Sequence, residues 1–461
     1  MTQAIQQSLR DKAWARWTVL VLIALTMFFA YMFVDVLSPL KSMLEKTAEE
    51  GGLGWSSTVF GTYGSSEFFL NVFFFFLIFA GIILDKMGVR FTAVLSGALM
   101  VIGALIKVYA LSATFNGGGF GFDMLNSFMT TMPPSAKLAC VGFMIFGCGC
   151  EMGGVTVSRA IVKWFEGKEM ALAMGLEMAV ARLGVFAVFR MSAPIAEHFQ
   201  SVQAPVILCL ILLCIGLLFY LIYGIFDARL EKTAGNLKEA EEEEPFRFKD
   251  LGKVFGSGIF WIVALLCVLY YSAIFPFQKF ATGMLETNLG LSAETASAIF
   301  SYFPIGAMII TPFLGAFLDF KGKGATMLML GSILMIICHT TFALFPFQTG
   351  DTLSTVVAYS AIVLLGVSFS LVPAALWPSM PKLIDAKVLG SAYSATFWIQ
   401  NVGLMITPIV IGSVLDATGG KYYLPMLIFA SFGVAALLLS LYLKAVDKKK
   451  GYGLELPNKK K

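Results

Sequence analysis

Long apolar runs separated by short polar segments recur along the whole chain. About 20 consecutive apolar residues in an α-helix cross the hydrocarbon core of a bilayer, and each of these runs reaches that length. The runs lack the apolar–polar alternation of barrel strands. We therefore predict an all-α membrane protein with twelve transmembrane helices. The predicted spans are residues 17–41, 58–84, 91–112, 138–163, 169–193, 204–226, 256–280, 294–318, 325–346, 353–378, 390–415 and 422–444.

Composition supports this class and argues against an enzyme. Hydrophobic residues make up 58% of the chain and charged residues 13%, with a mean hydropathy of +0.81, far from the values of a soluble domain. The only histidines are His198 and His339, all seven cysteines fall in apolar segments, and no metal-type CxxC pair or nucleophile motif occurs. We expect no enzyme activity, no metal and no cofactor.

Basic residues indicate the orientation. Arginine and lysine gather in the segments that share a side with both termini, and the loops on the other side hold only Lys41, Lys46, Lys137, Lys279 and Lys421. The positive-inside rule then places both termini in the cytoplasm. No Asn-x-Ser/Thr acceptor for glycosylation occurs in the chain, which favours a bacterial inner membrane.

One long hydrophilic segment divides the chain. Residues 227–253 include the acidic run EEEEP at 241–245, and they separate two groups of six predicted spans. We predict an N-terminal six-helix bundle (1–226), a cytoplasmic linker (227–253), a C-terminal six-helix bundle (254–445) and a basic cytoplasmic tail (446–461).

The two halves share a motif. Residues 81–90 read GIILDKMGVR and residues 315–324 read GAFLDFKGKG, so Asp85 and Asp319 occupy equivalent places, separated by about half of the chain. Such an offset is typical of parallel six-helix repeats. We predict that Asp85, Arg90 and Asp319 form latches that hold the inner side closed and break on opening. The alternative is that both segments are simply short turns.

The doubled motif resembles the loop pattern GxxxDxxGxR of the major facilitator superfamily, and the resemblance covers all twelve spans. A closer likeness is to the lysosomal dipeptide transporter family and its bacterial relatives. It rests on residues 147–151 (GCGCE), 164–169 (WFEGKE), 175–177 (GLE), 181–184 (ARLG), 275–277 (FPF), 375–378 (ALWP) and 400–404 (QNVGL). The resemblance implies two six-helix bundles in a pseudo-twofold repeat, alternating access, and a central cavity between them. One departure is Phe143, at a position where many superfamily members carry an arginine.

Two charged residues deep within predicted membrane spans, Glu151 and Arg182, are the main site candidates. Glu151 and Arg182 lie equally far from the starts of their predicted segments at Leu138 and Glu169, about 20 Å along a helix. Charges at such depth are expensive and usually functional. A carboxylate and a guanidinium at one depth suit a zwitterion, with its ammonium on Glu151 and its carboxylate on Arg182. The structural alternative is a buried ion pair between the two helices.

Further residues on the expected cavity helices join this site. Glu177 is a secondary site residue or an ion-pair partner. Tyr271 and Trp377 offer aromatic faces for a cation or an apolar side chain. Asn401 follows Arg182 at the same offset at which Gly403 follows Gly184, so the repeat puts a neutral polar group where the first half has its cation.

Four other polar residues within spans receive less specific roles. Asp35 and Glu67 are interpreted as gate or packing groups that could also take up protons. Lys107 is predicted to snorkel toward an interface, and His339 to be packed in the protein interior.

We therefore predict a secondary transporter that moves dipeptides, or other small zwitterionic peptides, by alternating access as a uniporter. Proton coupling through Glu151, Glu177 or Glu67 stays open. The alternatives are a proton-coupled transporter of organic anions or amino acids, and a non-transporting membrane sensor. The expected partners are the small-molecule or dipeptide substrate and the lipid bilayer, without nucleic acid. We expect a monomer, and an accessory subunit is left open.

Overall fold

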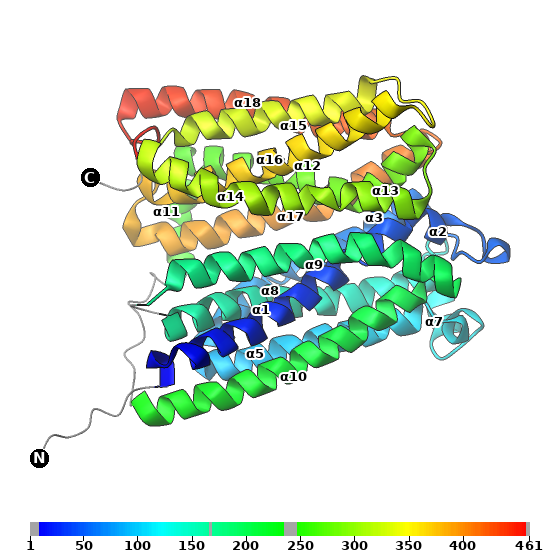
Figure 1. The fold of residues 1–461 in the computed structure, drawn as a ribbon, viewed down its shortest axis with the longest axis horizontal. Helices are drawn as coiled ribbons and strands as arrows, with labels where there is room; N and C mark the ends of the chain where they lie inside the picture. Colours follow the sequence, from blue (N-terminus) through cyan, green and yellow to red (C-terminus); the bar gives the residue numbers. More distant parts are fainter. Residues whose placement is uncertain (1–8, 166–167, 235–246, 458–461) are drawn as a thin grey trace, which may run out of the picture.

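A computed structural model describes residues 9–165, 168–234 and 247–457. In this part of the chain the secondary structure is helical throughout. Figure 1 shows two bundles side by side, one formed by the helices up to α10 and the other by those from α11 onward. The described chain begins and ends at the same end of the bundles, here called the terminal face; the end that carries α2, α3 and α7 is called the opposite face. The acidic run 241–245 and the residues 166–167 lie outside the described residues.

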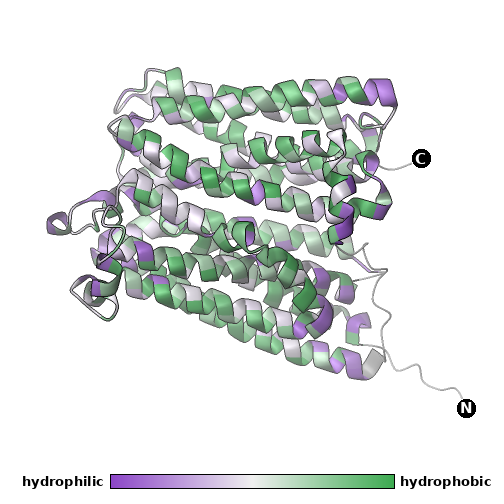
Figure 2. Ribbon diagram, turned by 180° about the vertical axis from the view of Figure 1, so that it is seen from behind, coloured by the Kyte–Doolittle hydropathy of each residue, from purple (hydrophilic) through white to green (hydrophobic). Residues whose placement is uncertain are grey.

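Within the described residues, eleven helices are long and apolar enough to cross a membrane. Figure 2 shows hydrophobic residues over the middle of the helices and hydrophilic residues toward their ends. The long helices are α1 (Ala13–Asp35), α5 (Phe76–Ala110), α8 (Pro134–Phe165), α9 (Met170–Phe199), α10 (Gln203–Ala234), α12 (Gly258–Leu289), α14 (Tyr302–Lys321), α15 (Gly324–Leu344), α16 (Thr352–Leu383), α17 (Leu389–Ala417) and α18 (Tyr423–Lys450). The shorter ones are α2 (Lys41–Glu45), α3 (Ser57–Ser66), α4 (Phe69–Phe73), α6 (Ala113–Asn116), α7 (Phe122–Asn126), α11 (Leu251–Phe255) and α13 (Ala293–Phe300).

The count is eleven rather than twelve because the predicted span 58–84 is interrupted, and its last part, from Phe76, is joined to the next predicted span in α5 across a kink at Gly88. It is divided into α3, α4 and the beginning of α5, with a left-handed residue, Phe75, at φ 52° between α4 and α5. The equivalent span of the second half breaks at Ser301, between α13 and α14. The step from Glu67, the first residue past α3, to Ser301 equals the step from Gly81 to Gly315 in the doubled motif. Broken helices at corresponding places of two repeats often mark a transport site.

Two glycines explain why the motif is repeated. Gly88 has φ 77° and Gly322 has φ 75°, and both occupy the same place after the first glycine of their motif. Positive φ is accessible to glycine at little cost, whereas a side chain would be strained there. The chain can therefore turn sharply between consecutive spans in both halves. This confirms that the repeat predicted from residues 81–90 and 315–324 is structural.

The end of the chain folds back on the second bundle. Helix α18 continues to Lys450, and the backbone N–H groups of Lys323 and Gly324 then donate to the carbonyls of Glu455 and Leu454. The Glu455 carboxylate accepts from the N–H of Thr326, 2.8 Å away, in the first turn of α15. Part of the segment predicted as a basic tail thus caps a helix of the bundle.

The two bundles meet tightly near the opposite face, where α3 crosses α17. A Cβ on Gly61 would lie 2.1 Å from the carbonyl oxygen of Pro408, so only glycine permits this approach. The Asp416 carboxylate accepts from the backbone N–H groups of Ser57 and Thr58 at 2.9 and 2.8 Å, which satisfies the free N-terminus of α3. At this end the backbones of α3 and α17 are therefore in direct contact, which joins the two bundles.

The structure corrects two predictions about lysines. Lys279 does not lie in a loop: α12 continues to Leu289, and the lysine is 5% exposed inside it. Lys107 does not snorkel: it is fully buried in α5, with its ammonium 3.7 Å from the centre of the Phe33 ring. His339 is packed as predicted, between the rings of Phe277 and Phe429 at 5.0 and 5.2 Å.

Candidate functional site

Glu151 and Arg182 lie at similar depth. Glu151 stands about four helical turns before the end of α8 at Phe165, and Arg182 stands about three turns after the start of α9 at Met170. Both of these helix ends lie at the terminal face. The two side chains form no ion pair with each other in the part of the chain that the structure describes. The structural alternative of a fixed ion pair therefore does not hold in this conformation.

Tyr31 on α1 lies among the predicted charges. The charges of Glu151, Glu177 and Arg182 all act on its hydroxyl, so Tyr31 lies near these three side chains. The sequence reasoning missed Tyr31. The available signal was its place in the middle of the first span, where it is the one tyrosine.

Arg182 reaches across to the second bundle. Its Nη1 donates to the hydroxyl of Thr311 on α14, at 2.8 Å, and its guanidinium lies 5.3 Å from the centre of the Phe369 ring on α16. Arginine commonly stacks on an aromatic face while its N–H groups remain available to an anion. The guanidinium is thus held by neutral partners, and its described contacts include no carboxylate that would already occupy it.

Two predicted aromatic residues lie in one cluster beside Arg182. The indole N–H of Trp377 donates to the hydroxyl of Tyr271 at 3.1 Å. Tyr271 stacks on Phe275 with ring centres 5.7 Å apart, and Phe275 meets Phe369 edge to face at 5.6 Å. This aromatic cluster on α12 and α16 connects Trp377 to the ring under Arg182.

Asn401 is not brought into this group by any described contact. It is buried on α17, and no described hydrogen bond involves its side chain. The repeat relation is nevertheless real, because Gly184 and Gly403 have the same role. A Cβ on Gly184 would lie 2.4 Å from the Phe28 carbonyl oxygen of α1, and a Cβ on Gly403 would lie 2.5 Å from Ser272 Oγ of α12. Each glycine permits a close helix crossing in its own half.

A buried charge cluster joins the two bundles closer to the opposite face. Lys279 of α12 lies 3.6 Å from Glu67 and 3.8 Å from Asp35, and all three side chains are almost fully buried. The Asp35 carboxylate also accepts from the amide of Gln278 and, at 3.1 Å, from the hydroxyl of Ser38. Asp35 and Glu67 belong to the first half and Lys279 to the second. The cluster is therefore an ionic contact between halves.

Phe143 lies between two lysines of this region. The ammonium of Lys107 is 4.2 Å from its ring centre and that of Lys279 is 5.3 Å away. The amine of Lys107 makes no described hydrogen bond and relies on the rings of Phe33, Tyr63 and Phe143. Where many superfamily members are expected to have an arginine, this chain has an aromatic ring with cations from two other helices around it.

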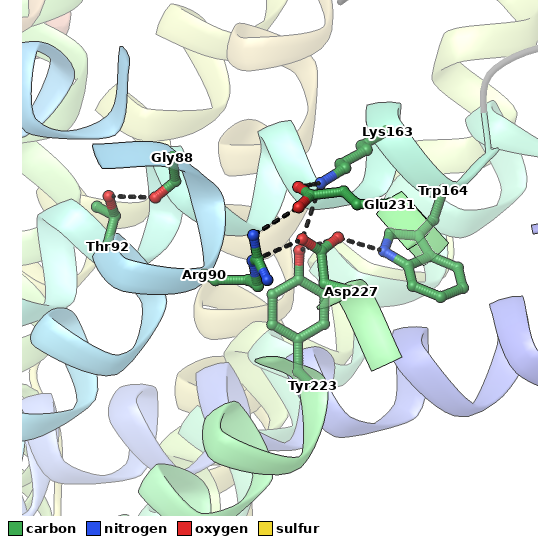
Figure 3. Close-up of polar contacts among 8 residues, drawn as sticks. All are labelled: Gly88, Arg90, Thr92, Lys163, Trp164, Tyr223, Asp227 and Glu231. Carbon is green, nitrogen blue, oxygen red and sulfur yellow. Dashed lines mark hydrogen bonds and ion pairs between the residues drawn. The ribbon is translucent and has the colours of Figure 1, made fainter. Parts of the chain in front are cut away.

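Figure 3 shows a second charge network at the terminal face of the first bundle. Arg90, two residues after the turn at Gly88, pairs with Glu231 at 2.5 Å and with Asp227 at 3.5 Å. Lys163 bridges the same two carboxylates at 2.9 and 2.8 Å. The indole of Trp164 and the hydroxyl of Tyr223 donate to Asp227 at 3.1 and 3.4 Å. The network fixes α5, α8 and α10 to one another.

The predicted latch residues Asp85 and Arg90 make their described contacts within the first bundle. Asp85 pairs with Arg159 of α8 at 3.1 Å, and their side chains are 60% and 42% exposed. Asp319 lies half-buried near the end of α14, at the equivalent place of the second half. The ion pairs described at the terminal face each stay within one bundle. Contacts between the bundles lie deeper: Arg182 donates to Thr311, the indole of Trp398 donates to the Val72 carbonyl at 2.9 Å, and α3 meets α17 toward the opposite face.

Comparison with known proteins agrees with this architecture. The sequence profile of the Major Facilitator Superfamily matches residues 22–406, and again residues 280–459. The chain is 30% identical over 396 residues to the lysosomal dipeptide transporter MFSD1 of Danio rerio, covering 84% of this chain and 78% of that protein. It is 26% identical over 319 residues to the probable sulfoacetate transporter SauU of Cupriavidus necator, covering 63% and 70%.

A solved structure supports the fold independently. The nucleoside transporter NupG superposes with a TM-score of 0.67 at 14% identity, covering 93% of this chain and 98% of that one. Profile, relatives and fold agree with the doubled motif and the two joined bundles. The chain therefore belongs to the Major Facilitator Superfamily of membrane transporters.

Proposed function

We propose that this chain transports dipeptides across a bacterial inner membrane as a uniporter that works by alternating access, with both termini in the cytoplasm. The observation that carries the proposal is the separation of Glu151 from Arg182. A guanidinium held by Thr311 and Phe369 can take the substrate carboxylate, and a carboxylate on a different helix can take the ammonium. The resemblance to lysosomal dipeptide transporters supports the same substrate class.

The aromatic cluster supports a role for the substrate side chains. Tyr271 and Trp377 lie beside Arg182 and offer apolar surface with a hydroxyl at its edge. In this proposal Glu177 helps to hold the ammonium end and Asn401 contacts the peptide bond in another state of the cycle. Two charged groups and an aromatic wall between bundles suit a short zwitterion better than a single free charge.

Transport of an organic anion is the second candidate. It is supported by the likeness to the probable sulfoacetate transporter and by the absence of a carboxylate partner for Arg182 among the described contacts. Under this alternative Glu151 would not bind substrate and would instead carry a proton. Glu177 and Glu67 are the other groups in the first half that could do so.

Counterflow into liposomes tests the proposal. Proteoliposomes loaded with unlabelled dipeptide should accumulate labelled glycyl-leucine, and collapse of the proton gradient should not change the rate. Sulfoacetate loaded inside should fail to drive the exchange. Exchange driven by sulfoacetate but not by dipeptide would overturn the substrate assignment, and exchange that requires a proton gradient would overturn uniport.

We expect Asp85→Asn to impair transport without unfolding the protein. Its pair with Arg159 is exposed, and such surface pairs contribute about 0–1 kcal/mol to stability. If the doubled motif acts as a latch, the turnover should nevertheless fall several-fold, because the contact must be remade in each cycle. Counterflow and the melting temperature in detergent are measured together. Asp123→Asn, in an exposed loop helix of the opposite face, is the control. Parent-like turnover of Asp85→Asn would contradict a latch.

A further inference from the structure

A cavity on the outer surface of the first bundle has no part in the proposed transport path. It measures about 560 Å³ and lies near the terminal face, between the part of α5 that follows Gly88 and the last turns of α10. The residues that define it here are Arg90, Phe91, Leu221, Ile225, Arg229 and Lys232. Its wall is apolar and its end is basic.

The apolar wall faces outward from the bundle. Phe91, Leu221 and Ile225 are 46%, 46% and 54% exposed, on helices that are long enough to cross a membrane. Gly224 lies among them, and a Cβ added there would meet no protein atom within 4 Å. The cavity is therefore open beside this glycine, in a region that a bilayer would fill with acyl chains.

The basic end lies at the level where the helices leave the apolar region. Arg229 and Lys232 are exposed near the end of α10. Arg90 is oriented by Asp227 and Glu231, and Lys163 joins the same network (Figure 3). In the described part of this neighbourhood Asp227 and Glu231 pair with Arg90 and Lys163, and Lys232 adds a positive charge beyond that network. The excess positive charge favours an anionic ligand.

We propose that this cavity binds one anionic phospholipid of the leaflet at the terminal face. Arg229 and Lys232 hold the headgroup phosphate, Arg90 contributes from the rim, and an acyl chain lies along Phe91, Leu221 and Ile225. Basic pockets between transmembrane helices bind anionic headgroups in this way. A soluble phosphate would use the cations but leave the outward-facing apolar wall uncovered. The bound lipid would connect the bilayer to Arg90, and so to the turn at Gly88.

Lipid selectivity of the purified full-length protein tests this proposal. Native mass spectrometry compares phosphatidylglycerol with phosphatidylcholine, and inorganic phosphate serves as the headgroup alone. The parent should bind phosphatidylglycerol at least about tenfold more tightly, a difference of about 1.4 kcal/mol. The double variant Arg229→Gln/Lys232→Gln should lose this preference. Gly224→Leu should weaken binding of either lipid in the cavity, because the new side chain enters the open space.

Two matched controls keep the outcome interpretable. Lys249→Gln/Lys253→Gln removes two exposed cations at the terminal face of the other bundle, and Gly258→Leu adds the same side chain where it also meets no atom within 4 Å. Both should bind phosphatidylglycerol as the parent does. Equal binding of the two lipids by the parent, displacement of the lipid by phosphate alone, or retained selectivity in both cavity variants would each overturn the proposal. Gly224→Leu keeps the test decisive if the double variant misfolds.

Discussion

Arg182→Ala is expected to reduce dipeptide counterflow more strongly than Glu151→Gln, and both variants should lose most of it. Truncating one partner of a buried, hydrogen-bonded charge pair costs about 2–5 kcal/mol. The lower figure already corresponds to about a 30-fold loss of affinity. Arg182 should show the larger effect, because Thr311 and Phe369 hold it in place and its removal also removes these contacts of α9 with α14 and α16. The measurement is the initial rate of labelled glycyl-leucine exchange against substrate concentration.

Modified substrates assign each end of the dipeptide. N-acetylation removes the ammonium, so it should weaken binding to the parent but change little in Glu151→Gln. Amidation of the carboxyl group should act in the same way on Arg182→Ala. Arg190→Ala is the control, since Arg190 is an exposed arginine of the same helix. The site assignment is wrong if both variants exchange dipeptide as the parent does, or if each responds to both modifications alike.

Lys279→Met should cause the largest loss of stability. The change keeps the length of the side chain but leaves Asp35 and Glu67 buried without the cation that lies within 4 Å of both. Breaking a buried ion pair by removing one partner costs about 3–5 kcal/mol. The free energy of unfolding in detergent should fall by that amount, and the contact between the bundles near the opposite face should loosen. Chemical unfolding followed by tryptophan fluorescence measures the loss.

A second substitution separates the charge from the packing. Adding Asp35→Asn to Lys279→Met removes one of the two uncompensated carboxylates, so part of the lost stability should return. Lys421→Met, at an exposed lysine of the same face, should have little effect. If Lys279→Met unfolds as Lys421→Met does, the cluster does not hold the bundles together.

The repeat was predictable because it depends on a few residues that lie close together in the sequence. Gly81, Asp85 and Gly88 recur with the same spacing in the second half, and the reason for the last glycine, a positive φ, acts within one turn of chain. The matching interruptions near Glu67 and Ser301 follow the same offset but were not predicted. A break in a helix that stays apolar leaves no gap in the hydrophobic pattern, and so the predicted span 58–84 looked continuous.

The similar depth of Glu151 and Arg182 was predictable from the sequence, whereas their contacts were not. Glu151 and Arg182 lie at similar depth because helical rise converts residue count into distance. Their lack of mutual contact depends on helix rotation, which a count of residues does not give. Thr311 and Phe369, the actual neighbours of Arg182, come from helices of the other bundle that are distant in sequence.

The burial and ionic contacts of Lys279 could not be predicted from the sequence alone. This lysine stands one residue before the predicted end of its span and was assigned to the loop side, but the helix continues from 280 to Leu289 and Lys279 lies in the interior. Hydropathy determined that this chain crosses the membrane many times, and the doubled motif determined its two related halves. The charged residues Glu151 and Arg182, deep within predicted spans, directed attention to α8 and α9. Only the tertiary structure decided that Asp35, Glu67 and Lys279 meet between the halves. A buried charge is tolerated only beside its counter-charge, and that pairing depends on how distant helices are rotated and packed.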